Sequence, residues 1–175
     1  MKFPSISFCV RLSAFELGLF AYFYLYKSRD YKVCMTYSLL VRKTGASRGT
    51  LLRAIKNLEE KGLLSTVKRY FRYRDTFSHR NCYHLIAPMS DDVVLPLKEI
   101  ISLPLSLDEK GLLLYLYYLA GEGGDTFMTK SEILQSFKPR PHKAFKNLCD
   151  KGYIEQSRCG VKLSADLLCI GITDM

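Results

Sequence analysis

Several features of protein chemistry are missing from this chain of 175 residues, and each absence excludes a class of protein. No apolar run approaches the roughly 20 residues that a membrane-spanning helix needs. The N-terminal stretch MKFPSISFCVRLS has one early Lys, an apolar patch interrupted by Ser, and no small-residue cleavage site, so we expect no signal peptide. These absences predict a soluble, cytoplasmic protein without a membrane partner.

The sequence also lacks the motifs of common catalytic sites. It contains no GxxxxGK[ST], GxSxG or HExxH pattern. The stretch GEGGD that starts at Gly121 joins two expected helices rather than a strand and a helix, so we interpret it as a turn and not as a phosphate-binding loop. We therefore expect no enzyme, no cofactor and no small-molecule substrate.

Potential metal ligands are present but scattered. The six cysteines form no CxxC pair, and the nearest two are ten residues apart. We therefore expect neither disulfides nor a zinc site. The histidines, His79, His84 and His142, are also scattered, and we expect structural roles or polar contacts for them.

An internal repeat organises what the sequence does contain. LSAFELGLFAYFYL from Leu12 aligns with LSLDEKGLLLYLYYL from Leu105 at an offset of 93 residues, and Lys56-Asn57-Leu58 aligns with Lys146-Asn147-Leu148 at an offset of 90. Both copies open with a capping box, Ser13 with Glu16 and Ser106 with Glu109. The repeat predicts two domains, residues 1–89 and 93–175, whose short linker brings them into contact.

Charge separates the two copies. Residues 1–90 hold 16 Lys and Arg against 5 Asp and Glu, whereas residues 91–175 hold 10 against 12. A basic domain suits nucleic acid, because neutralising several phosphates releases counterions. The apolar, tyrosine-rich runs at 21–26 and 114–119 predict helices that are buried on two sides, as core and as a domain or subunit interface.

The most informative stretch lies between Ser47 and Lys61. Leu51, Ile55 and Leu58 form a buried stripe with Leu52 and Ala54 on its flanks, Ser47 is a predicted N-cap, and Lys61-Gly62 ends the helix. The outward face is basic, as in a helix that enters a major groove.

The neighbouring residues extend this helix into a larger unit. A short helix at 36–44 and a tight turn at 45–46 precede it, and STVKRYFRYR, a polar tip at 75–80 and the strand NCYHLI follow as a hairpin, or wing, at 64–86. On the run IKNLEEKGLL and the NCYHLI strand, the chain resembles the winged helix-turn-helix superfamily, especially bacterial transcription regulators and plasmid or phage replication initiators. The resemblance implies an α+β, mainly helical fold with two winged helix-turn-helix domains in tandem. In the second copy, we expect helices at 107–120, 130–137 and 142–150 and a small wing at 156–163, because Pro139 and Pro141 shorten its third helix.

The candidate DNA contacts fall into two groups. Side chains expected to read base edges in the major groove are Arg48, Thr50, Arg53 and Asn57. Those expected to hold phosphates, several of them on the wing, are Arg42, Lys43, Lys56, Lys68, Arg69, Arg72, Arg74 and Arg80. The aromatic side chains Tyr70, Phe71 and Tyr73 either stack on bases or cover the core of the domain.

Two functions follow as hypotheses. In the first, the protein binds double-stranded DNA sequence-specifically as a transcription regulator or small replication initiator, and the second domain contacts a second copy of the chain or a protein partner. In the second, it is an adaptor or inhibitor from a phage or mobile element, whose winged helices bind a protein or a nucleoprotein.

Overall fold

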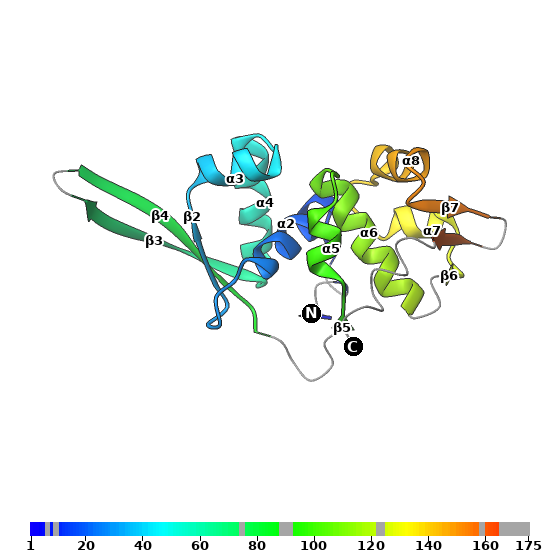
Figure 1. Ribbon diagram of the computed structural model, residues 1–175, viewed down its shortest axis with the longest axis horizontal. Helices are drawn as coiled ribbons and strands as arrows, with labels where there is room; N and C mark the ends of the chain where they lie inside the picture. The colour runs from blue at the N-terminus through cyan, green and yellow to red at the C-terminus, as the bar shows by residue number, and fades with distance from the viewer. Residues whose placement is uncertain are drawn as a thin grey trace.

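The computed structural model describes residues 1–5, 8, 11–73, 76–87, 93–121, 125–157 and 160–164. Its fold is α+β, with helices and small antiparallel sheets (Figure 1). After a short strand β1 (Lys2–Phe3), the first half of the chain contains one long helix, a strand, two further helices and a long hairpin. These elements are α2 (Ala14–Leu25), β2 (Lys32–Met35), α3 (Tyr37–Thr44), α4 (Arg48–Glu60), β3 (Leu64–Tyr73) and β4 (Thr76–Leu85).

The second half repeats this order behind its own lead-in, β5 (Val93–Val94) and α5 (Leu97–Ser102). Its elements are α6 (Leu107–Ala120), β6 (Asp125–Thr126), α7 (Lys130–Gln135), α8 (His142–Asp150), β7 (Ile154–Gln156) and β8 (Val161–Leu163). The two sheets have equivalent strand orders, β2-β4-β3 and β6-β8-β7. The repeat in the sequence therefore corresponds to a repeat of secondary structure and strand order.

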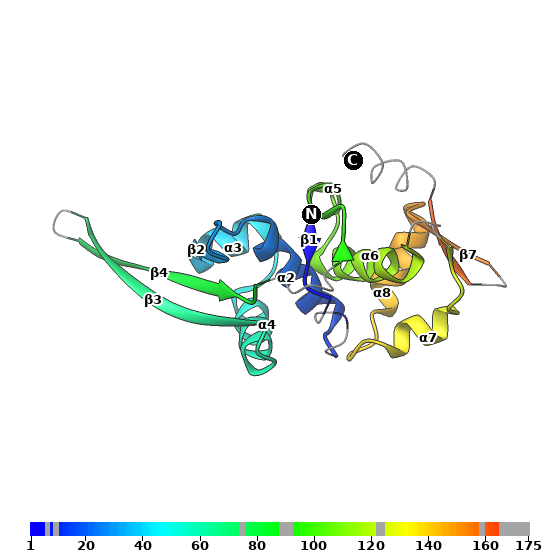
Figure 2. The ribbon, with the colours of Figure 1, turned by 90° about the horizontal axis from the view of Figure 1, so that it is seen from below.

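The two halves meet where α2 crosses α6, near the centre of the molecule (Figures 1 and 2). A Cβ atom on Gly18 would clash with the carbonyl oxygen of Leu107, and one on Gly111 would clash with that of Ala14. The two glycines therefore allow the helix backbones to touch. Apolar residues on nearly every side of α2 and α6 are buried, which confirms the expected burial on two sides.

The lead-in segments also tie the halves together. Strand β1 pairs antiparallel with β5, with Phe3 opposite Val93. The ring of Phe3 is fully buried and packs edge-on against Phe20 and Tyr24 of α2. Buried residues of both halves form one hydrophobic cluster, so the repeats share a core rather than having separate ones.

Local signals place the helix ends well. Capping boxes at Ser13 and Ser106 begin α2 and α6, and a third at Thr129 begins α7, in which its partner is Glu132. Helix α8 starts at His142 behind Pro141, as the prolines predicted. Helix α7 ends at Gln135, two residues before the predicted end at residue 137, in a turn that precedes Pro139.

The wing differs from its prediction at the tip. The polar residues 75–80 were expected as a loop, but β4 already begins at Thr76, and Arg80 lies opposite Arg69 within the ladder. The prediction was wrong because polarity identifies exposure and not the absence of backbone pairing. A ribbon with both faces in water can keep its ladder with polar side chains. Strand β2 covers only the base of this ribbon, where it pairs with Asn81–His84.

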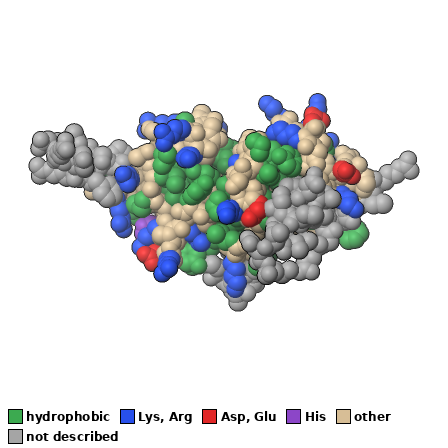
Figure 3. All heavy atoms as spheres, in the orientation of Figure 1, with side chains coloured by type: hydrophobic (Ala, Val, Ile, Leu, Met, Phe, Trp, Pro, Cys, Tyr) green, Lys and Arg blue, Asp and Glu red, His purple; other side chains and the backbone are tan. Residues whose placement is uncertain are grey.

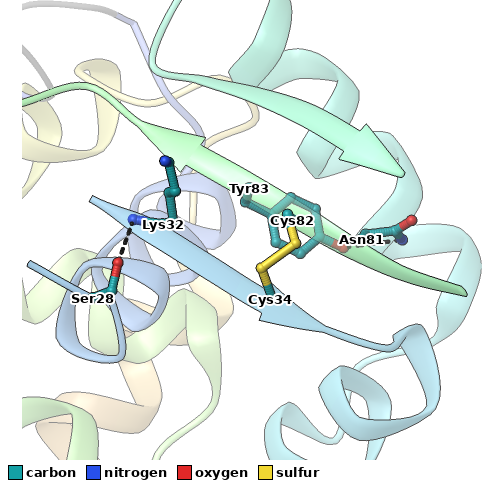
Figure 4. The surroundings of a disulfide bond; sticks show 6 residues. All are labelled: Ser28, Lys32, Cys34, Asn81, Cys82 and Tyr83. Carbon is teal, nitrogen blue, oxygen red and sulfur yellow. Dashed lines mark hydrogen bonds between the residues drawn. A yellow bond between two sulfur atoms is a disulfide. The ribbon is translucent and has the colours of Figure 1, made fainter. Parts of the chain in front are cut away.

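The expectation of no disulfides was also wrong, because Cys34 and Cys82 are bonded (Figure 4). They lie 48 residues apart in the sequence, but antiparallel pairing of β2 with β4 sets them directly opposite, with Cα atoms 4.1 Å apart. Short sequence spacings cannot detect a pair created by strand register. Cys149 is a free cysteine.

Candidate nucleic-acid interface

Helix α4 separates an apolar face from a polar one. Leu51, Ala54, Ile55 and Leu58 are buried. Ser47 caps the helix by accepting a hydrogen bond from the Thr50 amide at 3.2 Å. The exposed positions of the helix are 48, 49, 50, 52, 53, 56 and 60. The basic face predicted for α4 is therefore open to solvent.

Cationic side chains surround this face. Those exposed on α3, α4 and the described part of the wing are Arg42, Lys43, Arg48, Arg53, Lys56, Lys68, Arg69 and Arg80. In Figure 3 blue side chains lie along the upper edge of this half and at the base of its wing. Arg72 and Arg74 lie outside the side chains that the structure describes. The remaining predicted phosphate ligands thus share the end of the molecule that carries α3, α4 and the wing.

Among the described residues, few carboxylates neutralise the cations of α3 and α4. Within the described ranges, the ion pair on the outer face of α4 joins Lys56 to Glu60 at 3.5 Å, and both side chains are more than half exposed. A pair of this kind is weak and is easily exchanged for a phosphate. Glu59 points elsewhere, because its carboxylate accepts the Thr66 amide at 2.7 Å. The guanidinium of Arg48 lies 5.7 Å from the centre of the Tyr37 ring.

Asn57 does not join the exposed face. Its amide donates to a Glu16 carboxylate oxygen at 2.6 Å, and the ammonium of Lys61 donates to the other oxygen at 2.7 Å. Glu16 is almost fully buried at the start of α2. We therefore assign Asn57 to the anchoring of α4 on α2 and no longer to base reading.

The second half repeats this anchor. Asn147 of α8 donates to Glu109 at 2.8 Å, and Lys151 donates to the same carboxylate at 3.0 Å. Glu, Asn and Lys therefore recur in the sequence repeat because each set holds a third helix against a first helix. The aligned sequences show that these three residues recur, but they do not show which way the side chains point.

Both anchoring carboxylates are held ionised. Burial raises the pKa of Glu16, but hydrogen bonds from Lys61, Asn57 and the Ser13 amide outweigh it, so that the net pKa lies below the ordinary value of 4.5. Burial likewise raises the pKa of Glu109, and the Ser106 amide, Asn147 and Lys151 lower it further than burial raises it. Neither carboxylate adds negative charge to the exposed face of α4.

The wing contributes both cations and an aromatic side chain. Arg69 and Arg80 are directly opposite in the ladder, and both are exposed. The Tyr70 ring is 72% exposed, so it does not cover the core. The side chains of Phe71 and Tyr73 lie outside the described set, and base stacking stays a prediction.

Leu52 is a residue that the sequence interpretation placed wrongly. It was expected on the flank of the buried stripe, yet its side chain is 43% exposed. The signal for this position is its spacing from Gly49, Arg53 and Lys56, which gives an i, i+3, i+4, i+7 series of exposed residues along α4.

The second half presents a smaller polar surface. Helix α8 has 9 residues where α4 has 13. A groove of about 480 Å³ runs between the start of α8 and the starts of α2 and α6, lined among others by Arg140, Lys143 and Asp108. The pKa of Asp108 is raised by burial. Acidic and basic groups share this groove, in contrast to the cationic face of α4.

Other site types find no support in the described ranges. There, no three His, Cys, Asp or Glu side chains are grouped as a metal site would require. No helix among the described residues is both long and apolar enough to cross a membrane. No protein-family model matches the sequence, and the curated proteins include no significant relative.

Proposed function

We propose that the chain is a sequence-specific, double-stranded DNA-binding protein built from tandem winged helix-turn-helix units. Its role would be that of a transcription regulator or a small replication initiator. The first half would read DNA, and the second half would contact a second copy of the chain or a protein partner. We include a cytoplasmic location in the proposal, although the Cys34–Cys82 disulfide is more typical of oxidising compartments.

The observation that carries the proposal is the exposed cationic face of α4 beside the basic end of α3 and the wing. A rigid helix with one anchored face and one basic face fits the major groove, which is about 12 Å wide. Arg48, Thr50 and Arg53 occupy the face that would meet base edges. Arg42, Lys43, Lys68 and Arg69 lie around it, where phosphates of a docked duplex would run.

The experiment is a salt titration of binding to a labelled random-sequence duplex, followed by anisotropy. Counterion release predicts that the logarithm of the association constant falls linearly with the logarithm of salt concentration. The variant Lys68→Ala with Arg69→Ala should show a shallower slope. Binding that does not depend on salt would reject phosphate contacts by these cations, and no binding at low salt would reject a duplex as the ligand.

One observation favours the adaptor or inhibitor hypothesis as a second candidate. Phe127, next to β6 in the second half, is 91% exposed. An exposed aromatic side chain of this size is typical of protein interfaces. Capture of a discrete protein by the wild type, lost in Phe127→Ala while duplex binding is absent, would favour this hypothesis over DNA binding.

A further inference from the structure

The exposed stripe of α4 contains apolar as well as cationic positions. Leu52 stands one helical turn from both Arg48 and Lys56 and next to Arg53, and all four side chains are exposed. An isolated apolar side chain on a surface needs no explanation by itself. Leu52, however, lies in the middle of a face that would enter a major groove, and there an apolar side chain can contact only one kind of apolar group on DNA. The thymine C5-methyl is the apolar group that this groove displays.

Gly49 supplies an independent observation on the same stripe. Its φ is not positive, and a Cβ added to it would meet no atom within 4 Å. Neither a turn nor internal packing therefore requires glycine here. Glycine is a poorer helix former than alanine, and one setting in which it is used is close approach of the backbone to a ligand.

Gly49 and Leu52 together shape the exposed surface of α4. Gly49 lowers the surface of α4 one turn before Leu52, and cations flank both residues. We propose that Leu52 is a specificity-determining residue that contacts thymine C5-methyl groups, and that Gly49 allows α4 to approach the base pairs closely enough for this contact. The inference rests on the proposed binding of duplex DNA and adds the base feature that is recognised.

The test uses the full-length protein and two versions of one DNA pool. Duplexes selected by the wild type from a random library are resynthesised with deoxyuridine in place of thymidine, which removes only the C5-methyl. Burial of one such group corresponds to about a fourfold change in affinity. The wild type should bind the thymidine pool more tightly by about that factor per contacted methyl, and Leu52→Ala should bind both pools with more nearly equal affinity.

Val94→Ala is the matched control, because Val94 is an exposed aliphatic residue on β5, away from α4. It should keep the wild-type ratio between the pools. Gly49→Ala provides a second readout: it should not lower Tm, because alanine is the better helix former and meets no atom there, and yet it should weaken binding to the thymidine pool.

The possible results distinguish thymine recognition by Leu52 from duplex binding by the protein. If Leu52→Ala binds DNA but keeps the same ratio as the wild type, thymine recognition by Leu52 is wrong and duplex binding stands. Unchanged affinity in Gly49→Ala would overturn close approach at that position. If the wild type binds neither pool at low salt, the proposed function fails and this inference fails with it.

Discussion

The side-chain amide of Asn57 donates a 2.6 Å hydrogen bond to Glu16, forty-one residues earlier in the chain. This bond joins the exposed helix of the candidate interface to the central helix α2. Because Asn147 makes the equivalent bond to Glu109, the same polar contact orients α4 and α8 in their respective halves. We therefore expect loss of this contact to lower the stability of the fold rather than to change DNA recognition directly.

Glu16→Gln should destabilise the protein at neutral pH by about 1.5–3 kcal/mol, because it removes the charge that Lys61 and Asn57 face. The folded-state pKa of Glu16 lies below the ordinary 4.5, so its contribution is present above that pH and is lost as the pH falls through the folded value. Denaturant unfolding of the wild type should therefore lose stability below pH 4.5, and the variant should lose less. Glu60→Gln, at an exposed position, is the control; an equal effect there would contradict the anchor.

Gly111→Ala should destabilise the shared core by about 1–3 kcal/mol or more, because the added methyl would meet the Ala14 carbonyl across the α2–α6 crossing. Thermal unfolding measures the change. Gly49→Ala changes the same residue type in open space and should not destabilise. A tolerated Gly111→Ala would show that the helices can separate without cost.

Arg53→Ala should reduce affinity for a selected DNA site by about 1–3 kcal/mol and reduce affinity for random DNA much less, if Arg53 pairs bidentately with guanine. Competition binding with both duplexes gives the two numbers. Asn57→Ala is an instructive companion, because it should lower Tm through loss of its bond to Glu16. Equal losses on both duplexes for Arg53→Ala would exclude base reading by this residue.

The two halves should divide the work of DNA binding unequally. Lys143→Ala with Lys146→Ala on α8 should change the salt slope less than Lys68→Ala with Arg69→Ala on the wing, because the second half carries more acids than cations. These variants are made in the full chain, since the halves share one core and a fragment would expose it. A larger effect of the α8 variant would make the second half a DNA-binding unit as well.

Reducing the Cys34–Cys82 bond should lower stability by about 2–4 kcal/mol, because the bond closes a long loop between β2 and β4. Tm measured with and without dithiothreitol gives the effect, and Cys34→Ser should reproduce it while making Tm insensitive to the reductant. Thiol trapping of protein from cells, read by mass spectrometry, reports whether the bond forms where the protein is made. An unchanged Tm on full reduction would show that strand pairing alone holds β2 to β4.

What the sequence determined by itself was mainly local. Ser13 and Ser106 each predict a helix start through an amide three residues later, and the structure confirms both. The buried stripe of α4 follows from a period of 3.6 residues, and the shortened α8 follows from Pro141, which lies directly before it. These features depend on residues within one or two helical turns of one another, so they can be predicted from the sequence alone.

Only the tertiary structure decided the features that depend on how distant elements meet. The register of β2 against β4 joins Cys34 to Cys82, and the approach of α4 to α2 turns Asn57 inward. The same approach leaves Leu52 in solvent, although helical periodicity put it beside the buried stripe. Periodicity gives the angle of a side chain around its own helix axis. Whether that angle faces protein or water is determined by the neighbours that pack against the helix, and those neighbours come from elsewhere in the chain.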